Sequence, residues 1–247
     1  MFLLSFPFMI TFFSITYGQQ PTQQNQKSDF KCDSESMDRC AVRLFGYGNR
    51  SFNFADKREA VVQQCKVQKE AEICLRQYTT RCVKPFARQY VNLMLRGPAK
   101  SLKEKCSSKR GIDEYLKNAP CMRDTKEDMD KCAEDVVHNL MLVPRFKKQE
   151  WISLACCYLS KLEKCSKKAI DGKCSSDQSE YTSRAMKHLR GDILDLFCDQ
   201  ELAWGSPKCK NMISKLGDRE LKEKKPQSVL PVILNLMERY VSKSSPS

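Results

Sequence analysis

The chain has 247 residues, with 43 Lys or Arg against 30 Asp or Glu, so its formal net charge at pH 7 is +13. This charge favours anionic partners such as glycosaminoglycans, acidic lipids or acidic proteins. The length is sufficient for a hydrophobic core, so any disulfides would supplement that core rather than replace it.

The first 18 residues are apolar and carry no charged side chain. We predict that residues 1–18 are a secretory signal peptide, because small residues at Thr16 and Gly18 suit a cleavage site. A retained membrane anchor is the alternative, but the run is short for a membrane span. Residues 19–30 are Gln-rich and polar, which predicts a disordered lead-in. We expect no transmembrane segment after cleavage, and export argues against a nucleic-acid partner.

Fourteen cysteines follow Gly18. An even number of cysteines in an exported chain predicts a disulfide framework. The chain has no Cys-x-x-Cys and only two histidines, so we expect neither a metal nor another cofactor. The predicted disulfide cysteines are Cys32, Cys40, Cys65, Cys74, Cys82, Cys106, Cys121, Cys132, Cys156, Cys157, Cys165, Cys174, Cys198 and Cys209.

A short helix is expected over residues 32–44, followed by a glycine-containing loop over 46–51. That loop carries the only Asn-x-Ser/Thr sequon, at Asn49, which makes Asn49 a candidate glycosylation site. Residues 55–84 lack Pro and Gly and show a helical apolar stripe.

Pro85 is expected to begin another helix, and Gly97-Pro98 to break or kink it before it resumes toward Cys106. The inner face of that helix is predicted to carry Phe86, Tyr90, Leu93 and Met94. A short helix over 111–118 is expected to close at Pro120.

Residues 125–143 predict a long helix with Thr125 or Asp124 as its N-cap and Pro144 at its end. A central helix follows from Trp151 and stops at Asp171-Gly172. A last core helix is expected over 176–198, with apolar side chains facing inward from Met186, Leu189, Ile193 and Leu196.

No stretch alternates apolar and polar residues between turns, so the predicted fold is all-α, a disulfide-stapled multi-helix bundle. Its disulfide-rich domain is assigned to residues 31–213. Residues 214–247 are assigned to a basic linker and a C-terminal amphipathic helix, which either docks on the core or engages a partner helix or a membrane surface.

Helical geometry limits the cysteine pairing. Cys156 and Cys157 point about 100° apart on a helix, so each is expected to reach a different neighbour. Cysteines eight residues apart on one helix lie about 12 Å apart, so Cys74 is not expected to pair with Cys82. The spacing of the cysteines also favours four repeated three-cysteine units, although Gly and Pro fall at different places within them.

Catalytic motifs are missing from the sequence. The Cys-Cys-x-x-His of secreted phospholipase A2 lacks its histidine here, and His138 and His188 have no nucleophile motif nearby. Acidic residues at 192, 195 and 199 share a helical face, which is more often solvated than a calcium site. The protein is therefore not expected to be an enzyme.

Basic residues cluster at 145–168 and again at 208–225. Lys161, Lys164 and Lys168 share one helical face, which makes them an anion-binding candidate, although a solvated face is the commoner explanation.

Several short blocks resemble secreted cysteine-rich helical proteins of arthropods. These blocks are Cys74-Leu-x-x-Tyr-x-x-x-Cys82, Asn92-Leu-x-x-Arg-Gly97, Lys100-Ser-Leu102, Ala119-Pro-Cys121, Leu154-Ala-Cys-Cys157 and Ser206-Pro-Lys-Cys209. They resemble arachnid sequences over most of residues 65–215, and are similar in style to the 27 kDa hemolymph glycoproteins of insects. The resemblance implies a secreted, disulfide-rich helical protein and supplies no catalytic residues.

The leading expectation is a secreted, non-enzymatic extracellular protein that binds a protein or anionic partner through its basic surface. The alternative is a carrier of small apolar ligands in a cavity between the helices.

Overall fold

The computed structural model describes residues 31–190, 196–214 and 224–242. Eight α-helices and three short 3-10 helices make up most of these ranges, and no strand occurs in them, which confirms the all-α prediction. The predicted signal peptide and the Gln-rich lead-in, residues 1–30, lie outside the described residues.

The first three helices are α1 (Ser34–Phe45), α2 (Arg58–Cys82) and α3 (Pro85–Cys106). Asp33 caps α1 by accepting a hydrogen bond from the Ser36 N–H, and Pro85 begins α3 as predicted. The predicted break at Gly97-Pro98 is wrong, because α3 is continuous across it. A Cβ atom at residue 97 would lie 1.8 Å from the His188 carbonyl oxygen, so glycine allows a neighbouring helix to touch α3 here.

Helix α4 (Lys109–Leu142) corrects the largest error in the predicted helix boundaries. Pro120 lies inside α4 instead of closing a short helix, and Thr125 is buried and does not cap a new one. The Thr125 hydroxyl donates to the Cys121 carbonyl at 2.9 Å, a bond within one continuous helix. Proline inside a helix costs about 3 kcal/mol; the residues on either side of Pro120, Ala119 and Cys121, are both buried in the core.

Two single-turn 3-10 helices, η1 (Val143–Arg145) and η2 (Lys148–Glu150), join α4 to α5 (Trp151–Asp171). Helix α6 (Ser176–Arg190) follows, then η3 (Gln200–Leu202), α8 (Pro207–Ile213) and α9 (Val229–Ser242). Of the predicted inward positions in the last core helix, Ile193 and the side chain of Leu189 lie outside the described residues, and Leu196 is 66% exposed. The inward placement of Leu196 was therefore wrong.

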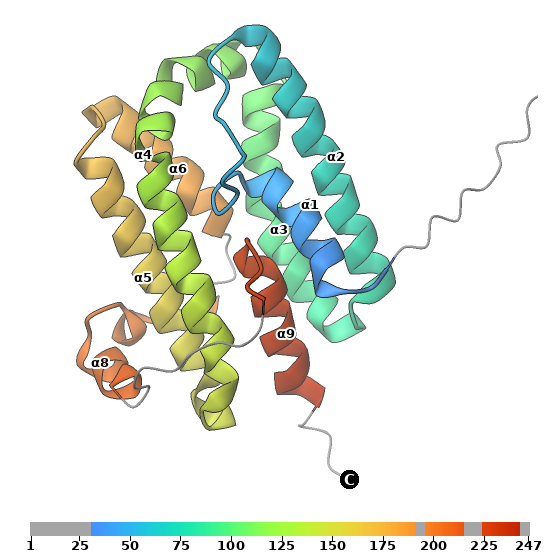
Figure 1. Cartoon of the computed structure of the whole chain (residues 1–247), viewed down its shortest axis with the longest axis vertical. Helices are drawn as coiled ribbons and strands as arrows, with labels where there is room; N and C mark the ends of the chain where they lie inside the picture. Colours follow the sequence, from blue (N-terminus) through green and yellow to red (C-terminus); the bar gives the residue numbers. More distant parts are fainter. Residues whose placement is uncertain (1–30, 191–195, 215–223, 243–247) are drawn as a thin grey trace, which may run out of the picture. The chain divides into compact units, whose positions relative to one another are not determined.

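The C-terminal helix α9 docks on the core, with Leu230, Val232, Leu234 and Leu236 buried. It contacts α1, α3 and α4, and Figure 1 shows it between the α2–α3 pair and the α4–α5 pair. Among the described residues, no helix is long and apolar enough to cross a membrane.

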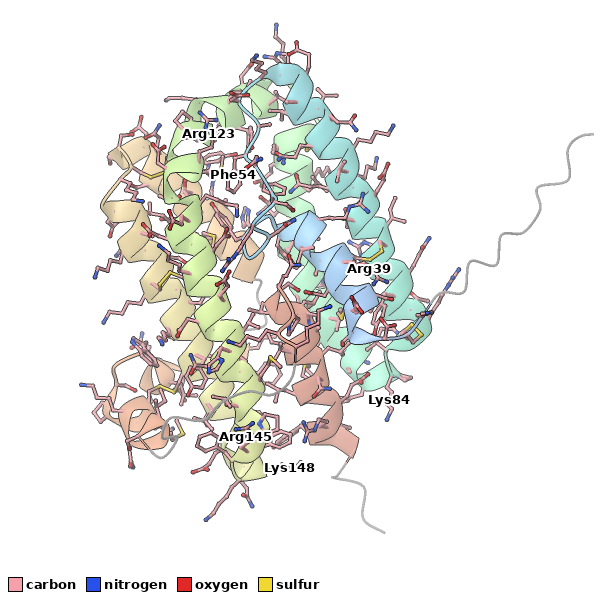
Figure 2. All side chains as sticks on the ribbon, viewed as in Figure 1. Arg39, Phe54, Lys84, Arg123, Arg145 and Lys148 are labelled. Atoms are coloured by element: carbon pink, nitrogen blue, oxygen red, sulfur yellow. A yellow bond between two sulfur atoms is a disulfide. The ribbon has the colours of Figure 1, made fainter. Side chains whose placement is uncertain are left out.

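All fourteen cysteines pair, which confirms the predicted framework. Cys156 bonds Cys198 while Cys157 bonds Cys209, so the two adjacent cysteines reach different neighbours as expected. Figure 2 draws the disulfides as yellow bonds between sulfur atoms. One of the bonds between helices is Cys132–Cys165, which joins α4 to α5.

The pairing shows two six-cysteine units instead of the predicted four three-cysteine units. In each unit the first cysteine bonds the fifth, the second bonds the fourth and the third bonds the sixth. The sequence separations agree between the units: 50 and 53 residues for Cys32–Cys82 and Cys121–Cys174, 34 and 33 for Cys40–Cys74 and Cys132–Cys165, and 41 and 42 for Cys65–Cys106 and Cys156–Cys198. The predicted grouping into three-cysteine units was wrong, because the disulfides join cysteines of different helices and connect one predicted unit to the next.

The two units give the bundle an internal correspondence. Helices α1, α2 and α3 of the first unit correspond to the second half of α4, α5 and α6 of the second. The third helices of the two units, α3 and α6, pack against each other. Only the Cys157–Cys209 bond has no counterpart, and it attaches α8 to α5.

Candidate functional site

An apolar pocket of about 230 Å³ lies between α3, α5 and α9. We call it the aromatic pocket, because five aromatic side chains line it together with Ile152: Phe86, Tyr90, Trp151, Phe197 and Tyr240. No charged side chain of the described residues lines it. An apolar cavity of about 150 Å³ is already large enough to hold benzene, so the aromatic pocket has room for a small apolar group.

A second pocket, of about 350 Å³, lies beside it between α4, α5, α6 and the start of α9. Its lining is largely apolar but includes Lys167 and Lys187, and we therefore call it the lysine pocket. Its apolar lining includes Phe45, Met129, Ile170, Met186 and Val229.

The two pockets share three lining residues, Met94 of α3, Leu159 of α5 and Ile233 of α9. The two pockets therefore adjoin, and we call them together the trough, with the aromatic pocket at one end and the lysine pocket at the other. Along α5 the lining runs from Ile152 to Ile170, which spans about 27 Å at about 1.5 Å per residue.

The sequence of α5 explains how one helix serves both the core and the trough. Leu154, Cys157 and Tyr158 are buried on one side. Ala155, Leu159, Leu162 and Ser166 follow at helical spacing on the trough side. Both faces are apolar in sequence, so hydrophobic periodicity alone does not separate them.

The predicted inner face of α3 is corrected by this arrangement. The buried residues of α3 are Ala87, Val91, Leu95, Pro98 and Leu102. Of the predicted inner face, Phe86 is 49% exposed and Leu93 is half-buried. Phe86, Tyr90 and Met94 line the trough instead of the core. In the sequence these large apolar side chains look like core residues, so the sequence analysis did not identify them as the lining of a pocket.

Helix α9 forms one wall of the trough and has no disulfide to the bundle, because no cysteine follows Cys209. Besides its buried apolar side chains, its N-terminal end is attached by hydrogen bonds to the Asp38 carboxylate, which accepts from the Gln227 N–H at 2.7 Å, the Ser228 N–H at 2.9 Å and the Ser228 hydroxyl at 2.8 Å. Gly48 lies directly against this segment, since a Cβ atom there would be 2.3 Å from the Gln227 carbonyl oxygen. The wall formed by α9 is therefore held by reversible contacts.

Polar groups in the trough gather at the lysine pocket. Ser166 is 3% exposed, and its hydroxyl has no hydrogen-bond partner among the described residues. Lys167 and Lys187 are exposed at the same pocket, from α5 and α6, and Glu163 also lines it. At the other end Lys148 lies over the ring of Tyr240, at 5.1 Å from its centroid, and Figure 2 places Lys148 beside Arg145 at that end of the bundle.

The three lysines of the anion-binding candidate differ in their surroundings. Lys161 pairs with Asp135 at 2.6 Å and lies 4.9 Å from the ring centroid of Trp204, so its charge is engaged within the fold. Lys164 and Lys168 are exposed and form no ion pair within the described ranges. The structure thus leaves two of the three lysines open to an external anion.

The sequon loop is ordered by its own side chains. The Asn49 side-chain carbonyl accepts hydrogen bonds from the Ser51 N–H and hydroxyl, at 3.1 and 2.7 Å. Its amide nitrogen donates to the Val42 carbonyl at 3.4 Å. Glycosylation of Asn49 stays a prediction.

The residues considered as catalytic or metal-binding candidates are separate from one another where the structure describes them. His138 and His188 lie on different helices, and burial lowers the pKa of His138. Asp199 accepts from the Leu202 N–H at 3.1 Å, while Asp192 and Asp195 lie outside the described residues. Within the described part of the chain, no group of three or more His, Cys, Asp or Glu is placed to hold a metal ion.

One half-buried cation lies away from the trough. Lys105 donates to the Gln68 side chain and lies 5.0 Å from the ring centroid of Tyr115. Burial lowers the pKa of Lys105 to about 8. The two pockets that Lys105 lines, of about 40 and 80 Å³, are both much smaller than the pockets of the trough.

Comparison with known proteins gives no match: no protein-family model, curated protein or solved structure matches the chain.

Proposed function

We propose that the protein is a non-enzymatic extracellular carrier that holds a small apolar molecule in the trough between α3, α5 and α9. The observation that carries this proposal is the pair of adjoining apolar pockets of about 230 and 350 Å³. Ligand sites are typically concave, mostly apolar and equipped with a few polar groups, and the trough has these features. Seven disulfides support the extracellular assignment.

Burial of a ligand tail supplies the binding free energy. Each methylene group removed from water contributes about 0.8 kcal/mol. The side chains that line an unfilled apolar pocket lack van der Waals contacts on one side. An apolar ligand would supply these contacts and so stabilise the folded chain.

The test uses cetyl alcohol, a neutral long-chain probe, and the emission of Trp151, which lines the aromatic pocket. The chain has two tryptophans, so the Trp204→Phe variant isolates Trp151. We expect a saturable change in Trp151 emission and co-elution of the probe with the protein in gel filtration. Absence of both in the folded, disulfide-bonded protein would refute the carrier function.

A second candidate function is anion binding through the basic surface, and the exposure of Lys164 and Lys168 favours it. The Lys164→Glu/Lys168→Glu variant should elute from heparin at lower salt than a variant with the same charge change at Lys66 and Lys69 of α2. Elution of the two variants at the same salt concentration would show that net charge alone determines retention on heparin, and would contradict a specific anion-binding surface.

A further inference from the structure

We propose that the ligand of the trough is a long-chain amphiphile with an anionic head group, with its tail in the aromatic pocket and its head at Lys167 and Lys187. This inference rests on the proposed carrier function and adds the class and orientation of the ligand.

The orientation follows from the chemistry along α5. The aromatic pocket is lined by apolar and aromatic side chains and carries no charge. Beyond the shared residue Leu159, the lining becomes polar at Ser166 and Lys167. An amphiphile matches this gradient in only one direction, because burial of a charged head among apolar side chains is strongly unfavourable.

The sign of the head group follows from the two lysines. Lys167 and Lys187 reach the lysine pocket from different helices. Neither forms an ion pair within the described ranges, whereas nearby Lys161 and Lys173 pair with Asp135 and Asp128. Glu163 lines the same pocket, so the described charged lining, Lys167, Lys187 and Glu163, has a net charge of +1 and favours an anionic head group such as a carboxylate.

Ser166 is an independent observation that indicates a polar ligand group. Its hydroxyl is buried in the lining, and a buried hydroxyl without a partner is unfavourable. A carboxylate or phosphate oxygen at the lysines would accept a hydrogen bond from it. The head group would then satisfy two cations and one hydroxyl at one place.

The length of the trough suits a long chain. The lining of α5 extends about 27 Å from Ile152 to Ile170. One acyl chain of a bilayer occupies about 15 Å, half of the hydrocarbon core. A chain anchored at Lys167 can therefore pass Leu159 and enter the aromatic pocket.

The experiment compares palmitate with cetyl alcohol, a matched pair that differs in the charge of the head group. Binding is measured by calorimetry on the Lys167→Glu/Lys187→Glu variant and on the control Lys66→Glu/Lys69→Glu. The control has the same change in net charge, and its two lysines lie exposed on α2 and line neither pocket. We expect the first variant to lose affinity for palmitate by about tenfold, while the control and all affinities for cetyl alcohol change less than twofold.

The outcomes separate this inference from the carrier function. If cetyl alcohol and palmitate bind equally and neither variant changes palmitate affinity, the carrier function stands and the anionic head group is refuted. If neither probe binds, the carrier function itself fails. A loss of palmitate affinity in Lys148→Glu, at the opposite end of the trough, without a loss in Lys167→Glu/Lys187→Glu would refute the proposed orientation.

Discussion

Replacement of Asp38 by alanine should weaken the attachment of α9 while the rest of the bundle is unaffected. The Asp38 carboxylate accepts three hydrogen bonds from Gln227 and Ser228, and these bonds hold the N-terminal end of α9. At about 1 kcal/mol each for partly exposed hydrogen bonds, their loss amounts to about 2–3 kcal/mol. Helix α9 has no disulfide, so this loss lowers the free energy of local opening rather than that of global unfolding.

The assay is native-state hydrogen exchange followed by peptide mass spectrometry. In Asp38→Ala, peptides covering 229–242 should exchange about 30- to 150-fold faster, whereas peptides of the cross-linked α4 and α5 should be unchanged. The control is Glu35→Ala, which removes an exposed ion pair with Lys224 at 3.3 Å and should change exchange by less than about fivefold. Unchanged exchange in α9, or an equal increase in all helices, would contradict a reversibly attached wall.

Three further changes have defined outcomes. Ala155→Trp places an indole in the aromatic pocket, where it should exclude about two methylene groups of a ligand tail. Palmitate affinity, measured by calorimetry, should fall about tenfold, while the shorter octanoate should bind as before. Unchanged palmitate affinity would contradict the position of the tail. Cys157→Ala/Cys209→Ala removes a disulfide that joins residues 52 apart in the sequence, and should lower the free energy of chemical unfolding by about 4 kcal/mol. An unchanged unfolding midpoint would show that this bond does not stabilise the fold. Because burial lowers the pKa of Lys105 from 10.5 to about 8, the unfolded chain binds more protons than the folded chain between these pH values. Stability should therefore rise from pH 8 to pH 10, and the rise should be absent in Lys105→Met.

The disulfide framework and most helices were predictable because they follow from local rules. Cys156 and Cys157 diverge on any helix, so their bonding to separate partners followed from helical geometry. Pro85 begins α3 as its backbone preference predicts, and α5 ends at Asp171 where the sequence places its end. The six-cysteine correspondence required the pairing itself, because cysteine spacing alone also suited a three-cysteine grouping.

The errors arose where tertiary packing outweighed a local preference. Pro120 and Gly97-Pro98 are helix breakers in isolation, yet both lie inside continuous helices. At residue 97 the close approach of the His188 carbonyl makes glycine necessary for packing. Local propensity is a weak prior where a helix is packed on several sides.

The trough itself could not be located from the sequence. Phe86, Tyr90 and Met94 follow the same helical spacing as core residues, and only the positions of α5 and α9 decide that they face a pocket. Likewise, Lys167 is one residue from Lys168 and has no distinguishing motif, but only Lys167 lines the lysine pocket. The carrier alternative was foreseen in general terms, whereas its residues came from the structure.

The most direct measurement is native mass spectrometry of the protein purified without detergent from its natural source, followed by solvent extraction of the same sample. The account predicts a mass increment on the folded chain that disappears after extraction, and recovery of a long-chain anionic lipid in near-equimolar amount. A folded, fully disulfide-bonded chain that carries no such increment and takes up no palmitate when it is supplied would contradict the account.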